Sequence, residues 1–139
     1  MKESRNAIHS DDYSLDSAGV SGTISNVSIY TRMKGVGTTN CYGGPYMLTW
    51  FEALSVYFES GTYNKLTTTW TDYSKSLDTN PHTSSPWTWE DIALLRMRIK
   101  LRGYNSSSYA CCSKAWIVVT YTEAITGMTR RRIIRMPFN

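Results

Sequence analysis

The chain has 139 residues, of which 41% are hydrophobic and 19% are charged. This length and composition are typical of one folded domain and exclude a disordered chain. Glu52 interrupts the longest apolar stretch, residues 46–58, and Glu59 ends it, so the sequence predicts no membrane-spanning helix. Serine and threonine together supply 34 residues, and ten Tyr, five Trp and nine Gly accompany them. Such a composition favours strands and turns over helices.

The charge is distributed unevenly along the chain. Its net value of +4 comes from 15 Lys and Arg against 11 Asp and Glu. Arg130, Arg131, Arg132 and Arg135 lie in the last ten residues, so residues 1–129 carry eleven charges of each sign and are neutral overall. A basic face covering the whole domain is therefore not expected, and the sequence does not favour a nucleic-acid partner.

The chain divides into three segments. Residues 1–21 are polar without a sustained period, and we expect them to form an N-terminal arm. Residues 22–123 alternate apolar and polar side chains repeatedly, which predicts an antiparallel β-sandwich with one short helix near residues 89–95. Residues 124–139 form either a basic C-terminal arm or an edge strand, and the sequence leaves both open.

The first half of the domain predicts strands of unequal clarity. Residues 23–34 alternate cleanly and end in a turn signal at Gly35 and Gly37, after which residues 41–45 read as a loop. Residues 46–63 predict two short strands. The threonine-rich stretch that follows predicts a strand over residues 66–70, with Leu66, Thr68 and Trp70 on one face. Tyr73 and Leu77 indicate a second, more exposed strand.

The second half contains the one convincing helix start. Thr88 is placed to cap a helix over residues 89–95, with Asp91 three positions later as its reciprocal partner. The next strand, residues 96–102, has cations on one face and apolar side chains on the other. Residues 109–123 form a long strand that is apolar on both faces at its centre, where we expect Trp116 in the core.

The cysteines and the histidines give no sign of a metal site or an active site. Cys41 can reach at most one of the adjacent Cys111 and Cys112, so one disulfide or three thiols are both open. With two His and no paired-cysteine motif, zinc is not expected. His9 and His82 have no nucleophile motif beside them, and the acidic pair at residues 90–91 reads as helix capping. We therefore expect neither an enzyme nor a cofactor.

Aromatic and cationic residues suggest binding instead. Trp50, Trp70, Trp87 and Trp89 would stack on sugar rings if they were exposed together, and the alternative is that they pack in the core. The cations of residues 96–102 are interpreted as a solvated strand face that resists edge pairing, in preference to a nucleic-acid surface. A further group could dock a partner or act as an exchanged strand, and it comprises Arg130, Arg131, Arg132, Ile133, Ile134 and Arg135.

Several segments resemble a widespread group of jelly-roll domains found in phage, prophage and archaeal-virus structural proteins and in related surface proteins. The most specific segment is residues 80–92, and residues 25–30, 71–74, 99–101 and 116–121 also carry the resemblance. It covers about residues 11–123. Met97 departs from the family, which usually has glycine there, and longer relatives have further strands upstream of residue 11.

The resemblance implies a jelly-roll sandwich with no catalytic residues to carry over. We therefore expect a non-enzymatic structural subunit of a virion or an extracellular filament, joined through its arms to copies of itself or to other proteins of the same assembly. The alternative is a carbohydrate-binding module at a cell surface, which would require exposed tryptophans clustered on one sheet.

Overall fold

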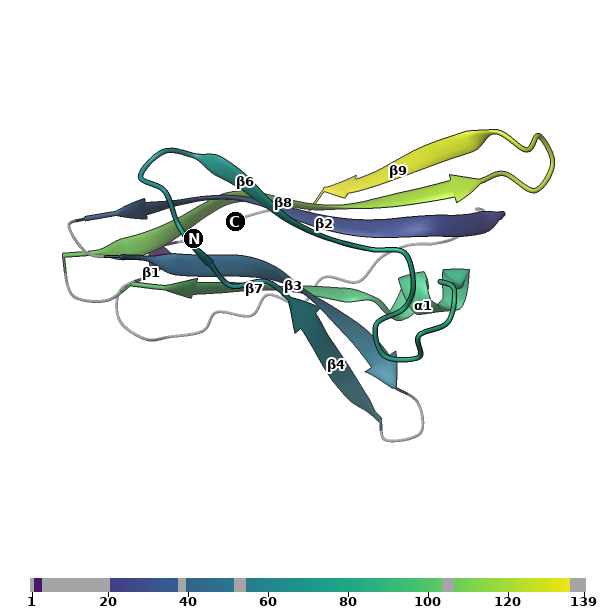
Figure 1. Cartoon of the computed structure of the whole chain (residues 1–139), viewed down its shortest axis with the longest axis horizontal. Coiled ribbons are helices and arrows are strands. Elements are labelled where there is room, and N and C mark those ends of the chain that lie inside the picture. Colours follow the sequence, from purple (N-terminus) through teal and green to yellow (C-terminus); the bar gives the residue numbers. More distant parts are fainter. Residues whose placement is uncertain (1, 4–20, 38–39, 52–54, 104–106, 136–139) are drawn as a thin grey trace.

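The computed structural model describes residues 2–3, 21–37, 40–51, 55–103 and 107–135. Its elements are β1 (Lys2–Glu3), β2 (Thr23–Val36), β3 (Tyr42–Phe51), β4 (Val56–Gly61), β5 (Asn64–Lys65), β6 (Thr71–Leu77), α1 (Trp89–Leu94), β7 (Arg96–Arg102), β8 (Tyr109–Thr122) and β9 (Thr129–Arg135). The strands form two antiparallel sheets that face each other (Figure 1). This confirms the predicted all-β sandwich with one short helix, and its jelly-roll type stays a prediction.

The first sheet, here called sheet A, is built around β2 and β8. These two strands pair over their full lengths, from Thr23 opposite Thr122 to Val36 opposite Tyr109, although they are far apart in sequence. β6 pairs with the other side of β2. On the far side of β8, β9 pairs with residues 116–122 and β1 pairs with residues 110–111. Strand β8 is therefore central, as its apolar middle predicts.

The second sheet, sheet B, is built around β3. Strand β7 pairs along one side of β3, from Tyr42 opposite Arg102 to Leu48 opposite Arg96. Strands β4 and β5 pair along the other side, β4 with residues 46–51 and β5 with residues 42–43. The hairpin of β3 and β4 reaches beyond the body of the sandwich (Figure 1).

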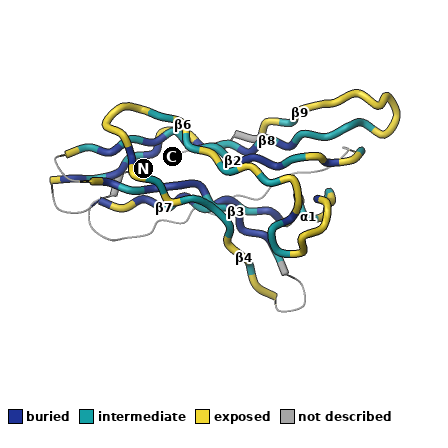
Figure 2. Tube along the Cα trace, in the orientation of Figure 1, coloured by how far each residue is buried: buried dark blue, intermediate teal, exposed yellow. Residues whose placement is uncertain are grey.

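The hydrophobic core fills the space between the sheets (Figure 2). Alternation decides which side chains reach it, because successive residues of a strand point to opposite faces. On β7, Met97, Ile99 and Leu101 are buried while the intervening cations face outward. Val27 and Ile29 of β2 meet Ile117 and Val119 of β8 on the same inner face.

Helix α1 begins at the predicted cap. The Thr88 hydroxyl accepts a hydrogen bond from the Asp91 backbone N–H at 3.1 Å, and the Asp91 carboxylate accepts one from the Thr88 N–H at 2.9 Å. Both bonds of the capping box are therefore present. The helix ends at Leu94, one residue before the predicted end, because Leu95 is already extended and enters the core.

Strand β3 corrects one prediction. The loop predicted over residues 41–45 is strand from Tyr42 onward. A side chain at Gly44 would collide with the carbonyl oxygen of Thr62, so the glycine permits a close approach of the two backbones. The same glycine that reads as a turn signal thus serves strand packing.

The strand predicted over residues 66–70 is absent, and its backbone is instead satisfied by other segments. The Leu66 N–H donates to Cys41 O, and the Gly35 N–H donates to Thr67 O, each at 2.8 Å. The Thr67 hydroxyl bonds locally to Thr69 O at 2.9 Å. Threonine hydroxyls that bond the nearby backbone compete with a strand ladder, and a run of three threonines offers several such bonds.

The core placement predicted for Trp116 is wrong. Ile117 and Val119 occupy the inner face of β8, so Trp116 projects from the outer face of sheet A. There its ring stacks on Tyr30, with ring centres 5.2 Å apart and planes 5° from parallel. The apolar run at residues 116–119 conceals the alternation because both faces of the strand use large apolar side chains.

Candidate functional site

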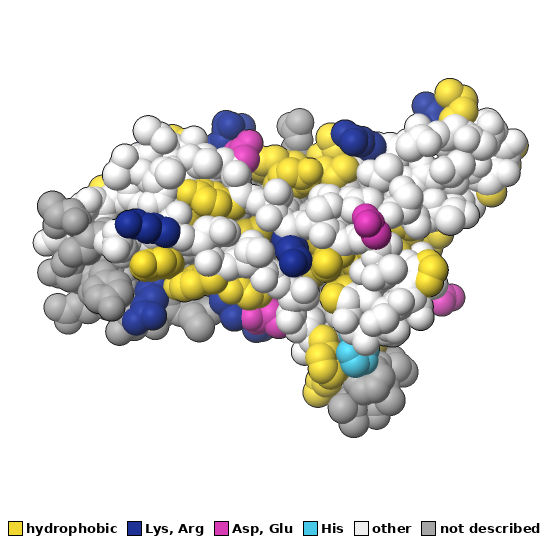
Figure 3. Space-filling model, viewed as in Figure 1, with side chains coloured by type: hydrophobic (Ala, Val, Ile, Leu, Met, Phe, Trp, Pro, Cys, Tyr) yellow, Lys and Arg dark blue, Asp and Glu magenta, His cyan; other side chains and the backbone are white. Residues whose placement is uncertain are grey.

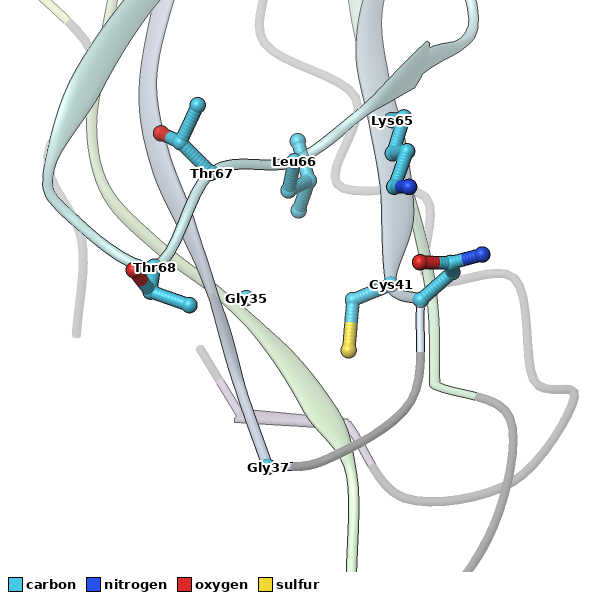
Figure 4. A pocket seen from close by; sticks show the side chains of 8 residues that line it. Gly35, Gly37, Cys41, Lys65, Leu66, Thr67 and Thr68 are labelled. Atoms are coloured by element: carbon cyan, nitrogen blue, oxygen red, sulfur yellow. The ribbon is translucent and has the colours of Figure 1, made fainter.

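A cleft of about 470 Å³ opens where β3 begins, and its lining is the first place to look for chemistry. Thr67 and Thr68 lie on one side of it, and Cys41 and Lys65 on the other (Figure 4). Burial raises the pKa of the Cys41 thiol, because burial disfavours the thiolate. The described lining contains no carboxylate or imidazole to act as a base, so this cleft does not present an activated nucleophile.

The three cysteines form no disulfide in the structure. Cys41 and Cys112 are buried and Cys111 is partly exposed. Burial raises the pKa of the Cys112 thiol to about 12, and a hydrogen bond to the Lys114 carbonyl opposes the shift. Of the two states left open by the sequence, the structure therefore has the thiols.

The other titratable residues considered in the sequence analysis form structural contacts wherever the structure describes them. Asp91 closes the helix cap, and the imidazole of His82 stacks on the Phe58 ring with centres 3.9 Å apart. His9 lies outside the described residues. Among the described residues no group of three or more His, Cys, Asp or Glu side chains could hold a metal ion.

The four tryptophans singled out for sugar stacking do not share one surface. Trp87 is only 4% exposed, and its indole N–H donates to Leu77 O at 3.0 Å. Trp89 packs edge-on against Tyr121 and donates to Gly22 O at 2.9 Å. Trp50 belongs to sheet B, whereas Trp70 precedes β6 of sheet A and lies under the Lys34 ammonium. Two of the four thus pack in or against the core, and the other two lie apart, Trp50 on sheet B and Trp70 outside any strand.

The C-terminal segment contains the strongest candidate for an interaction surface. Of the two alternatives for residues 124–139, the described part adopts the edge strand, because β9 pairs with β8 from Thr129 to Arg135. Arg130, Arg131 and Arg132 all belong to this strand, together with Ile133, Ile134 and Arg135. Arg130 forms an ion pair with Glu123 of the same hairpin, with N and O 3.4 Å apart.

The β8–β9 hairpin exposes apolar side chains to an unusual degree. Ile125 is 94% exposed, Met128 53% and Ile133 57%. The hairpin lies along the margin of sheet A, and its turn extends past the rest of the sandwich (Figures 1 and 2). Ile133 stands opposite Val118 on the outer face, and the next outer-face residue along β8 is Trp116, whose ring stacks on Tyr30. We call this set, Tyr30, Trp116, Val118 and Ile133 with the turn residues Ile125 and Met128, the apolar margin.

Comparison with protein-family models, with curated proteins and with solved structures finds no match for this chain. Among the described residues, no helix is both long enough and apolar enough to span a membrane. The functional argument therefore rests on the surfaces of the sandwich themselves.

Proposed function

We propose that this chain is a non-enzymatic structural subunit of a larger assembly, a virion component or an extracellular filament, that associates through strand β9 and the apolar margin. The observation that carries the proposal is the exposure of Ile125, Met128 and Ile133 on an edge hairpin. Large exposed apolar groups that lie together mark interaction sites, and an edge strand offers backbone groups to a further strand.

The side of β9 that does not pair with β8 supplies a second argument. Strand addition gains main-chain hydrogen bonds along the strand, and pockets for alternate side chains give specificity. Arg131 and Ile133 alternate with Arg132 along β9, so a partner strand would meet cations and apolar groups in turn. Copies of the same chain, or other proteins of the same assembly, are the proposed partners. The virion or filament setting rests on the resemblance to jelly-roll structural proteins.

The association is tested by one substitution on β9. Ile133→Lys places a charge where a partner strand would pack, and Lys on edge strands opposes further pairing. The side chain is 57% exposed, so we expect the fold to survive. Light scattering should then show a smaller particle for Ile133→Lys than for the unaltered chain, with an unchanged circular dichroism spectrum.

The matched control is Val56→Lys, which makes the same change on the edge strand of the other sheet. Val56 is also exposed, at 42%, and lies on β4. Its particle mass should equal that of the unaltered chain. An Ile133→Lys protein that assembles like the unaltered chain would remove β9 from the interface, and equal losses in both variants would indicate general destabilisation rather than a specific surface.

A further inference from the structure

The outer face of sheet B gathers cations that the charge balance of the whole chain conceals. Arg96, Arg98, Lys100 and Arg102 leave the core in alternation along β7. Described acids on this face are limited to Glu59 of β4, which pairs with Arg98 at 3.0 Å and also with Lys100. Along the lower margin of the sandwich in Figure 3, Lys or Arg side chains lie next to an acidic side chain. The face is therefore locally basic although residues 1–129 are neutral.

Aromatic rings from β3 and its neighbours lie among these cations. Successive strand residues point to opposite faces, so Tyr46 and Trp50 lie on the face of β3 opposite to that of Met47 and Thr49, and both are partly exposed. The Lys100 ammonium lies 4.2 Å from the centre of the Tyr46 ring. At the other end of β3, Tyr42 stacks on Tyr63 with ring centres 5.9 Å apart.

The arrangement is most open at this second end. Tyr42 pairs with Lys65 of β5 on one side and with Arg102 of β7 on the other, so a ring lies between two cations in one row across the sheet. Lys65, Arg102 and Tyr63 are exposed, Tyr63 at 44%. We call Tyr42, Tyr63, Lys65 and Arg102, with the Tyr46–Lys100 pair beside them, the basic aromatic face.

We propose that the basic aromatic face binds single-stranded nucleic acid. Proteins that bind single strands combine a cationic track for the phosphates with aromatic rings on which bases stack. A duplex keeps its bases paired and stacked inside, and an acidic polypeptide offers no regular series of flat rings, so each would use only part of this face.

This proposal is independent of the proposed function, because the two surfaces lie on opposite sheets. It also reverses the earlier interpretation of the cations of residues 96–102 as a solvated strand face. That interpretation relied on the net charge of residues 1–129, which does not show where in space the charges lie. The register of β3 with β5 and β7 brings the cations together with tyrosines that lie some 20 to 60 positions away in sequence.

Fluorescence anisotropy of the full chain with labelled oligothymidylate tests the proposal. A probe of about 20 nucleotides exceeds the roughly 4–16 nucleotides that comparable sheet surfaces contact. Binding should be detectable at about 50 mM salt and should weaken toward 200 mM. If Lys65, Lys100 and Arg102 of the basic aromatic face each neutralise one phosphate, the slope of log K against log salt should be about −2.

Two pairs of variants separate the face from general charge. Lys65→Gln with Arg102→Gln should weaken binding at least about tenfold and flatten the salt slope by about 1.4. The control, Lys34→Gln with Lys114→Gln, removes the same charge from sheet A without touching β9 and should change binding little. Tyr63→Ala should weaken binding at least about fivefold, whereas Trp70→Ala, which removes an equally exposed ring just before β6, should not.

Several results would overturn the proposal. No binding of oligothymidylate at about 50 mM salt would exclude it, and so would equal losses in the two charge variants. If unlabelled polyglutamate displaced the probe as well as oligothymidylate did, and Tyr63→Ala had no effect, the face would serve an acidic protein instead. Tighter binding of a duplex than of the single strand would likewise remove the role assigned to the rings.

Discussion

Asp91 shows how one member of an acidic pair can form a helix cap. It stands beside Glu90 in the first turn of α1, where negative charge interacts favourably with the positive end of the helix. Its carboxylate accepts the Thr88 N–H, and its own N–H is held by the Thr88 hydroxyl. These bonds hold the carboxylate in the cap, and the helix in turn places Ile92 in the core.

The cap predicts a definite loss of stability when it is removed. Thr88→Ala deletes the hydroxyl that accepts the Asp91 N–H and should cost about 1 kcal/mol of the free energy of unfolding. Urea denaturation followed by circular dichroism measures this cost. Thr68→Ala, at an exposed position outside any helix or strand, is the control and should be nearly neutral. A Thr88→Ala protein as stable as that control would show that the cap contributes nothing.

The cysteines make a second prediction at this scale. The thiolate is the reactive form, and burial raises the pKa of Cys41 and takes that of Cys112 to about 12. Both thiols should therefore stay protonated near pH 8, while Cys111 is partly exposed. Alkylation with iodoacetamide followed by mass spectrometry should find Cys111 modified first. Modification of Cys112 at the same rate would contradict the burial seen in the structure.

Among the elements, β7 and α1 follow from the sequence and β3 and β9 do not. The seven residues of β7 alternate strictly, and the cap of α1 is a local signal, so each needs no knowledge of distant segments. The start of β3 depends on how closely Gly44 approaches Thr62, which only the folded chain reveals. Likewise, residues 129–135 form an edge strand because they pair with β8. The segment has no periodicity of its own that would predict a strand.

The candidate surfaces show the same division. The cations of residues 96–102 are visible in the sequence, but the tyrosines among them come from β3 and from the turn between β4 and β5. Strand register decides which cations and tyrosines become neighbours, and a single sequence does not specify that register. The sugar-stacking hypothesis depended in the same way on placement, and the burial of Trp87 removes one of its four residues.

The corrected position of Trp116 changes the prediction for β8. Ile117 is fully buried on the inner face, so Ile117→Ala should cost about 2–5 kcal/mol through lost burial and a cavity. Trp116→Ala removes a half-buried ring stacked on Tyr30, and an aromatic pair contributes only about 0.5–1.5 kcal/mol beyond its buried area. Thermal unfolding of both variants should show the larger loss for Ile117→Ala. The opposite order would return Trp116 to the core.

At the scale of the whole molecule, the two outer faces of the sandwich differ in chemistry. Sheet A presents the apolar margin, with Ile133 and the Tyr30–Trp116 stack, and sheet B presents the basic aromatic face. In the two proposals above, the apolar margin contacts neighbouring subunits and the basic aromatic face contacts a polyanion. Each half of this account has its own test, so either can fail alone.

The most direct test of the central claim, association through β9, is the particle mass of the full chain compared with that of a chain ending at Glu123. No described residue beyond Glu123 belongs to the hydrophobic core, so the shortened chain should keep its β-type circular dichroism spectrum. Light scattering should give the full chain a mass well above its 15.8 kDa and the shortened chain a clearly smaller one. Equal masses for two folded chains would contradict the account.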